Sequence, residues 1–339
     1  MSSTAVESHE ISQGQFRSLT IAKAINEGLR RVLSDDSSTL LMGEDIGPLG
    51  GVYRVTEGLV EQFGTDRVVD TPLAESGIVG TAIGMALRGY RPICEIQFDG
   101  FVFPGFNQIT TQLAKIRARS RGALSAPVVI RIPYGGGIGS IEHHSESPEA
   151  LFAHTAGLRI ITPSNPHDAY WMIQQAVLCP DPVIIFEPKR RYWLKGEVDL
   201  TDPGRGAFEA QVLREGRDAT VVAYGPLVPV ALAAARAAEE DGRSLEVIDV
   251  RSLSPIDFDT VAASVEKTGR LLIAHEAPTF GGLGGEIAAR ISERVFYSLR
   301  SPAIRIGGFH MPYPVARAEE QYLPDIDRIL EALDRALAY

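Results

Sequence analysis

The sequence predicts an α/β protein of two domains, an open and mostly parallel sheet followed by a smaller α/β domain. Three observations predict this class. The chain has 339 residues, of which 45% are hydrophobic and 22% charged, a length and composition typical of about two soluble domains. Continuous apolar runs, suited to strands covered on both faces, alternate with helical stretches. A stretch rich in charge, glycine and proline, residues 191–207, divides this pattern and is interpreted as a linker.

The first domain is expected over residues 16–190. Before it, residues 1–15 are polar without a sustained period and are interpreted as a mobile tail. The apolar runs predict strands at residues 39–43, 91–96, 127–131 and 182–186. Helices are expected between them at residues 19–33, 76–87, 108–119 and 167–178.

The second domain is expected over residues 208–339 as a further alternating set. Strands are predicted at residues 219–223, 245–250, 270–275 and 303–306, and helices at 228–241, 257–267, 286–295 and 325–337. The glycine-rich run at residues 281–285 follows a strand and opens a helix, but it lacks the spacing of a dinucleotide fingerprint. A tight turn with close packing is therefore favoured there.

Composition excludes several classes of function. Lys and Arg number 33 against 43 Asp and Glu, so a net charge of −10 argues against nucleic acid and acidic membranes as partners. The chain lacks an apolar run of membrane-spanning length and opens without signal-peptide features, so a cytoplasmic protein is expected. Cys94 and Cys179 lie inside apolar runs and are expected to be buried thiols.

A glycine-rich run at residues 135–139 leads into a polar loop that carries His143 and His144. Ser147 is expected to cap the following helix, with Pro148 as its first residue. Residue types alone leave two interpretations open, a solvated loop or a loop that presents reactive side chains. A metal site is less well supported, because no further His or Cys stands at ligand spacing.

The segment Asp70-Thr71-Pro72-Leu73-Ala74-Glu75 opens the helix expected at residues 76–87. Gly77, Gly80 and Gly84 give this helix a face almost free of side chains, where another helix could approach. Each mid-helix glycine costs about 1 kcal/mol, so such a contact should offset it. Glu75 stands where the helix dipole favours a carboxylate, although an ordinary N-terminal acid would look the same.

Six motifs occur in order along the chain: Gly43-Glu44-Asp45, Asp70-Thr71-Pro72-Leu73-Ala74-Glu75, Glu95-Ile96-Gln97-Phe98, His144-Ser145-Glu146-Ser147-Pro148-Glu149, Phe186-Glu187-Pro188-Lys189 and Asp249-Val250-Arg251-Ser252-Leu253-Ser254-Pro255. Together they resemble the β subunit of the thiamine-diphosphate-dependent 2-oxo-acid dehydrogenases. The resemblance covers nearly the whole chain. It implies a first domain that binds the pyrimidine end of the cofactor and a second domain like the C-terminal domain of transketolase.

The resemblance also implies roles for single residues. Glu75 would hydrogen-bond N1′ of the aminopyrimidine and favour its imino tautomer. Phe101 would pack on that ring, and Leu73, Gln97 and Glu44 would complete the cofactor pocket. His144, rather than the neighbouring His143, would be the acid or hydrogen-bond donor in acyl transfer to lipoamide.

The resemblance further implies a shared active site. A diphosphate-binding half needs a Gly-Asp-Gly segment followed by Asn residues that hold the cation, and this chain contains no Gly-Asp-Gly. Mg²⁺ and the diphosphate would therefore be held by an α subunit, in a heterotetramer of two α and two β chains. A structural K⁺ is also implied, bound mainly by main-chain carbonyls at Ala126, Val128, Val129, Ala176, Cys179 and Asp181.

The motifs look closest to branched-chain members, so 3-methyl-2-oxobutanoate and related 2-oxo acids are the expected substrates. Pyruvate is the alternative substrate, and a non-catalytic assembly subunit is the alternative of another class. Docking to the lipoyl acyltransferase core is expected at the acidic end of the second domain, near Glu319, Glu320, Asp325 and Asp327. A simple solvated acidic face is the competing interpretation of that end.

Overall fold

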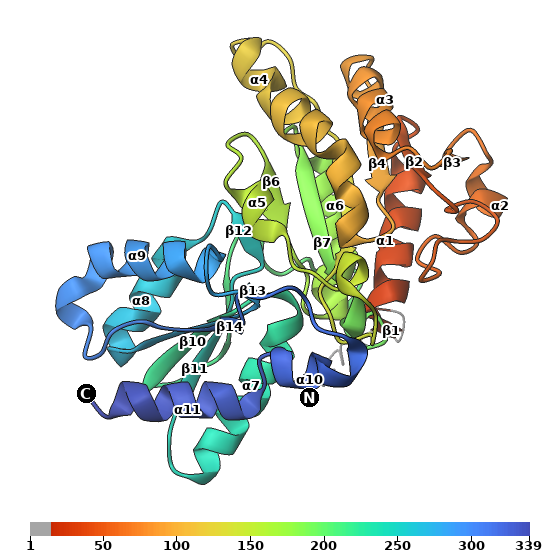
Figure 1. The fold of residues 1–339 in the computed structure, drawn as a ribbon. Coiled ribbons are helices and arrows are strands. Elements are labelled where there is room, and N and C mark those ends of the chain that lie inside the picture. Colours follow the sequence, from red (N-terminus) through yellow and green to blue (C-terminus); the bar gives the residue numbers. More distant parts are fainter. Residues whose placement is uncertain (1–14) are drawn as a thin grey trace, which may run out of the picture.

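The structure, a computed structural model, describes residues 15–339 (Figure 1). These residues form two α/β domains on mostly parallel sheets, which confirms the predicted fold class. In Figure 1 the first domain runs from red to green and the second from teal to blue. The tail expected at residues 1–15 lies outside the described residues, except for Gln15.

The first sheet has seven strands in the order β12–β6–β7–β5–β4–β2–β3, and every pair except β12–β6 is parallel. The strands are β2 (Thr39–Gly43), β3 (Val68–Asp70), β4 (Arg91–Glu95), β5 (Val129–Tyr134), β6 (Arg159–Ile161), β7 (Val183–Pro188) and β12 (Ser252–Ser254). β2, β5 and β7 are buried along their whole length, as their apolar runs predict. All four predicted strands occur, with ends shifted by at most three residues.

Helices cover both faces of this sheet. α1 (Ile21–Asp35) and α6 (Pro166–Leu178) pack together on one face, while α3 (Glu75–Leu87) and the 3₁₀ segment η1 (Asp99–Gly105) lie on the other. α1 and α6 each begin after a side-chain cap, Thr20 and Asn165. The remaining helices of this domain are α2 (Leu59–Phe63), α4 (Ile116–Arg119) and α5 (Glu149–Ala153).

The second sheet has five strands in the order β14–β13–β10–β11–β9, with only β9 antiparallel to its neighbour. The strands are β9 (Gln211–Arg214), β10 (Ala219–Ala223), β11 (Leu245–Asp249), β13 (Leu271–Pro278) and β14 (Ile304–Gly308). Figure 1 shows helices on both faces, namely α7 (Val228–Glu240) and α11 (Ile326–Leu337) on one and α8 (Phe258–Thr268) and α9 (Leu283–Val295) on the other. The short helix α10 (Glu319–Tyr322) precedes α11.

The two domains interlock through β12. This strand belongs to the second half of the sequence, yet it pairs antiparallel with β6 at the edge of the first sheet. Just before it, Arg251 has a positive φ of 58°, and its buried guanidinium binds both carboxylate oxygens of Asp168 at 2.8 and 3.2 Å. One buried cluster also contains side chains from both domains, including Tyr134 and Tyr224. The domains therefore share a continuous core.

The stretch interpreted as a linker contains a strand. β8 (Lys195–Asp199) pairs antiparallel with β1 (Phe16–Thr20) in a separate two-stranded sheet. The sequence pattern does not indicate β8, because four of its five residues are charged or glycine and its pairing partner is far away in the chain.

Two predicted helix details are wrong. The helix expected at residues 108–119 is broken into a π-helical turn at Gln108–Gln112, a 3₁₀ turn at Leu113–Lys115 and α4. The Thr110 hydroxyl donates to the carbonyl oxygen of Phe106 at 2.8 Å, a local bond that competes with regular helix geometry. α5 begins at Glu149 with Pro148 as its N-cap residue, so Ser147 does not cap it.

Cys94 and Cys179 are buried free thiols, which confirms that prediction. Across residues 15–339, none of the helices combines the length and the apolar character needed to cross a membrane.

Candidate functional site

The carboxyl ends of β2, β3 and β4 meet at one edge of the first sheet. Glu44 follows β2, Leu73 and Glu75 follow β3, and Gln97 follows β4. Because ligands bind at this edge in open α/β sheets, the topology brings the predicted cofactor residues to a suitable place.

Glu75 is the first residue of α3, and its exposed fraction is only 9%. The N-terminal end of the helix dipole stabilises a carboxylate there. Gly105 of η1 packs on the main chain of Glu75, since a Cβ at Gly105 would lie 3.3 Å from the Glu75 carbonyl oxygen. Leu73, two residues earlier, is 71% exposed. A buried acid, Glu75, and an exposed apolar side chain, Leu73, thus lie two positions apart at this edge of the sheet.

Glu44 lies close enough to Glu75 to feel its charge, and Gln97 bonds to the segment that follows β2. The Gln97 amide nitrogen donates to a carboxylate oxygen of Asp45 at 3.3 Å and lies 3.5 Å from the carbonyl oxygen of Glu44. Burial raises the pKa of Glu44, and the nearby charges of Asp45 and Glu75 raise it further. Three carboxylates with one amide therefore give this part of the site a negative potential.

His144 packs against two aromatic rings. It ends the short 3₁₀ turn η4 (Glu142–His144), and its ring meets those of Phe98 and Phe101 edge-on, at centroid distances of 4.3 and 5.2 Å. Within the described residues its buried Nδ1 has no hydrogen-bond partner. Burial lowers the pKa of His144, and the charges of His143 and Lys189 lower it further. The ring is therefore held in its neutral form near pH 7.

A buried ion pair, which no sequence pattern indicated, supports the His144 loop. The Lys189 ammonium contacts Asp99 Oδ1, and both side chains are fully buried. Asp99 Oδ2 accepts a hydrogen bond of 2.9 Å from the main-chain N–H of Glu146. Lys189 ends one of the six motifs and Asp99 directly follows another, but nothing in the sequence indicates that they pair across 90 positions.

A second buried charge cluster was also missed. Arg131 on β5 binds both carboxylate oxygens of Glu187 at 2.7 and 2.9 Å and one of Glu95 at 2.5 Å. The Tyr192 hydroxyl donates to Glu187 at 2.6 Å. These groups satisfy one another and join the middle of β5 to the carboxyl ends of β4 and β7.

The glycine-rich run at residues 135–139 binds carboxylates of the second domain. The main-chain N–H groups of Gly137 and Gly139 donate to Glu319 at 2.7 and 2.9 Å, and that of Gly136 donates to Glu276. A Cβ at Gly136 would lie 1.7 Å from the Tyr313 hydroxyl oxygen, so only glycine fits. The expectation that Glu319 belongs to an acidic docking face is wrong, because its buried carboxylate is saturated by these contacts and the Tyr313 hydroxyl.

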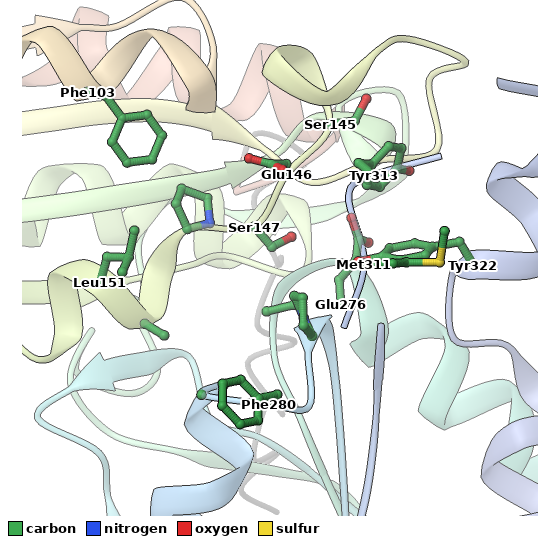
Figure 2. A pocket seen from close by; sticks show the side chains of 16 residues that line it. Phe103, Ser145, Glu146, Ser147, Leu151, Glu276, Phe280, Met311, Tyr313 and Tyr322 are labelled. Carbon is green, nitrogen blue, oxygen red and sulfur yellow. The ribbon is translucent and has the colours of Figure 1, made fainter. Parts of the chain in front are cut away.

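A cavity of about 250 Å³ lies between the domains beside the His144 loop (Figure 2). Ser145 and Ser147 of the loop line it together with Glu276, Phe280 and other side chains of the second domain. The hydroxyl oxygens of both serines have no hydrogen-bond partner within the described residues, and Glu276 Oε2 has only an ion contact of 3.1 Å with Arg190. These oxygens are suited to bind water in the cavity, although most of its lining is apolar. Neither Glu75 nor His144 lines it, so it adjoins the candidate site.

The residues implied for K⁺ lie at the other, amino-terminal end of β5 and β7. Ala126 and Asp181 line one cavity there. Three of the carbonyl oxygens already accept a main-chain hydrogen bond, those of Ala126, Val128 and Ala176. Each carbonyl retains a second lone pair, so these groups are compatible with a cation. Within the described residues, no group of three or more His, Cys, Asp and Glu side chains is arranged to hold a metal ion.

Two family models match this chain. Residues 17–193 match the pyrimidine-binding domain of transketolase, and residues 209–329 match its C-terminal domain. A solved structure described as a split-gene transketolase in an inactive β4 tetramer superposes with a TM-score of 0.77 at 22% identity, over 94% of this chain and 98% of that one. Fold and family models therefore define a protein of the transketolase-like class with these two domains.

The sequence relatives narrow this class. The chain is 62% identical to the pyruvate dehydrogenase E1 component subunit beta of Leifsonia xyli, over 96% of each chain. It is 52% identical to the 3-methyl-2-oxobutanoate dehydrogenase subunit beta of Mycobacterium tuberculosis, over 95% of this chain and 92% of that one. This chain belongs to the β subunits of the E1 components of 2-oxo-acid dehydrogenases, which confirms the family that the motifs indicated.

Proposed function

We propose that this chain supplies the pyrimidine end of a thiamine diphosphate site in a branched-chain 2-oxo-acid dehydrogenase. The enzyme would oxidatively decarboxylate 3-methyl-2-oxobutanoate and related acids and pass the acyl group to a lipoyl group of the acyltransferase. The observation that carries the proposal is the placement of Glu75, Phe101 and His144 at the carboxyl edge of the first sheet.

These residues suit the pyrimidine end of the cofactor. Glu75 offers a buried carboxylate, Gln97 an amide and Phe101 an aromatic face, and this set contains no cation that would meet a diphosphate. Nδ1 of His144 is buried and has no hydrogen-bond partner among residues 15–339, which supports a bound group as its partner. When bound, thiamine diphosphate supplies the electron sink for decarboxylation.

Glu75 and His144 have separate tasks in this proposal. Glu75 hydrogen-bonds the ring nitrogen N1′, and its position at the start of α3 keeps the carboxylate available for that bond. His144 donates a hydrogen bond or proton to the acyl acceptor. Its lowered pKa favours the neutral ring, which donates through one nitrogen only.

An α subunit completes the site in this proposal. It would hold Mg²⁺ and the diphosphate, in a heterotetramer of two α and two β chains. The highly exposed Leu73 supports a partner at the mouth of the site. The glycine face of α3 is also open at Gly84, since nothing among residues 15–339 lies within 4 Å of a Cβ placed there. A helix of another subunit would fill that face.

The substrate choice rests on the motifs and on the relative from Mycobacterium tuberculosis. Pyruvate is the second candidate, because the relative from Leifsonia xyli at 62% identity bears a pyruvate dehydrogenase name. An apolar pocket discriminates by only about 1 to 3 kcal/mol per methylene, so a few side chains decide between the two.

Reconstitution of the holoenzyme tests the proposal. The chain is combined with its α subunit and thiamine diphosphate, and kcat/KM is measured for 3-methyl-2-oxobutanoate and for pyruvate. We expect at least about tenfold preference for the branched acid, which is about 1.4 kcal/mol of discrimination. Equal or better turnover of pyruvate would assign the chain to the second candidate.

A Glu75→Ala variant serves in the same experiment. We expect assembly with the α subunit to persist while decarboxylation falls by two orders of magnitude or more, about 3 kcal/mol of transition-state stabilisation. Retained decarboxylation would instead support a non-catalytic assembly subunit.

Three further parts of the proposal have their own tests. Binding of K⁺ at the carbonyls around Ala126 and Asp181 predicts a higher thermal midpoint in potassium than in sodium salts.

Docking to the lipoyl acyltransferase core is tested by co-sedimentation of the assembled enzyme with that core. The cytoplasmic location is tested by cell fractionation.

A further inference from the structure

The loop that carries His144 is held by the first turn of η1 through three separate contacts. The rings of Phe98 and Phe101 meet the His144 ring edge-on. Gly100 lies against the main chain of His143, because a Cβ there would come within 2.6 Å of the His143 carbonyl oxygen. The carboxylate of Asp99, between these residues, reaches the main-chain N–H of Glu146.

Asp99 is the polar member of this arrangement, and it is fully buried. One carboxylate oxygen contacts the Lys189 ammonium, and the other accepts from the Glu146 N–H at 2.9 Å. Only an ionised carboxylate accepts on both oxygens, because an amide or a protonated carboxyl turns one position into a donor. The double contact therefore needs both the residue type and its charge.

Lys189 supplies the charge that this arrangement needs. It follows β7 directly, is fully buried, and lies 5.7 Å from the centre of the Phe98 ring, which itself contacts His144. Without Lys189, Asp99 would be a buried carboxylate with one main-chain donor. The pair thus links the end of β7 to the His144 loop.

We propose that Asp99 is a positioning residue for His144, that it holds the His144 loop through the main-chain N–H of Glu146, and that Lys189 keeps Asp99 in its charged form. The inference deepens the proposed function, because it rests on the role given there to His144. Nothing in the motifs assigns a task to either residue.

The electrostatic setting fixes the expected pH dependence. Burial raises the pKa of Asp99 to about 6, while Lys189 opposes that rise. Below pH 6 the carboxyl therefore gains a proton and loses one of its two contacts. The remaining charged or titratable groups that act on the pair or on His144 are Tyr53, Glu142, His143, Glu149, Glu276 and Glu319.

The experiment measures two rates on the holoenzyme reconstituted with its α subunit. The first is acyl transfer to lipoamide, which uses His144. The second is decarboxylation of the same 2-oxo acid coupled to an oxidising dye, which does not require transfer to lipoamide. For the unaltered enzyme we expect an acid limb near pH 6 in the lipoamide rate only. The same limb in both rates would overturn the inference without any substitution.

Substitutions sharpen the test. In Asp99→Asn we expect the lipoamide rate to fall about tenfold or more and its acid limb to disappear, with the dye rate unchanged within about twofold. In Lys189→Met the acid limb should move to higher pH by about one unit or more, because a cation that lowered the pKa of Asp99 is gone. Lys189→Arg keeps the charge and should keep the limb in place.

The controls separate this role from general stability. Asp168→Asn disrupts another buried ion pair, with Arg251, outside the His144 loop, and should leave the shape of the pH profile unchanged. Equal losses of both rates in Asp99→Asn, or an unmoved limb in Lys189→Met, would overturn the inference. His144→Ala tells the two proposals apart. If it retains the lipoamide rate, the proposed role of His144 fails. If it loses that rate while the pair variants change nothing, only the inference fails.

Discussion

At the residue scale, Glu149 is a fully buried acid at the junction of the domains. Its Oε1 accepts a hydrogen bond of 2.7 Å from the Tyr224 hydroxyl of the second domain, while Oε2 has no partner within the described residues. Burial raises the pKa of Glu149 to about 8, although the bond from Tyr224 opposes the rise. The carboxyl is therefore protonated in the folded protein at neutral pH.

This shift predicts a pH-dependent stability. A carboxyl whose folded pKa lies above its unfolded value stabilises the fold fully below the unfolded pKa and loses that contribution as pH rises through about 8. We expect the isolated chain to lose about 2 to 3 kcal/mol from this group between pH 6 and pH 9. Urea unfolding measures it. The matched Glu149→Gln variant should show a correspondingly flatter pH dependence, and an unchanged slope would contradict the assignment.

At the scale of elements, α3 begins with the proposed cofactor residue Glu75 and has a glycine face that is exposed among residues 15–339. Glu75 opens the helix and is buried, whereas Gly77, Gly80 and Gly84 are exposed in this chain. A glycine in mid-helix lowers stability by about 1 kcal/mol relative to alanine, and at Gly84 no contact among the described residues offsets that cost. In the isolated chain, α3 is thus less stable than the same helix with alanine at Gly84 would be.

Gly84→Ala is expected to have opposite effects on the chain and on the assembly. The free energy of unfolding of the isolated chain should rise by about 0.5 to 1 kcal/mol, which a higher thermal midpoint would report. Alanine favours the helix, and its Cβ would meet open space. Assembly with the α subunit should weaken if the glycine face is a subunit contact. Sedimentation of the mixture measures this. Stronger or unchanged assembly would contradict the proposed contact. Gly89→Ala is the control: Gly89 lies beyond the helix at a φ of 95°, so alanine there should only lower the stability of the chain.

At the scale of the whole molecule, the second half of the chain completes the first sheet. β12 forms its edge, and Arg251 just before it binds Asp168 and the carbonyl oxygens of Gly206 and Glu209. Glu276 and Glu319 of the second domain bind the glycine-rich run that precedes the His144 loop. The geometry of the candidate site therefore depends on both domains.

We expect the described parts of both domains to unfold together. Arg251→Met leaves the Asp168 carboxylate buried without its partner, which costs about 3 to 5 kcal/mol. Hydrogen exchange followed by mass spectrometry should show faster exchange in β6 and in β10 alike. Faster exchange in only one of these strands would show that the domains are energetically independent. Arg31→Met, which removes a cation from an ion pair with Asp35 whose two side chains are more than half exposed, is the control and should change exchange little.

Local patterns in the sequence determined much of this protein. The long buried strands and the capped or amphipathic helices were predicted to within about three residues, because the 2- and 3.6-residue periods are local properties. Short or polar strands such as β8 and β12 were missed, since only a distant partner makes them strands. The resemblance of six motifs indicated Glu75, Phe101 and His144, which the fold brings to one sheet edge.

Only the tertiary structure decided which charges meet. Asp99 with Lys189, Arg131 with Glu187, and Glu319 with the glycine-rich run are pairs separated by 56 to 182 positions. A sequence shows each charge as an ordinary polar residue, and its surroundings are set by how the strands and domains pack. Once buried, these charged residues must be paired, because an unpaired charge in the interior costs far more free energy than one in water.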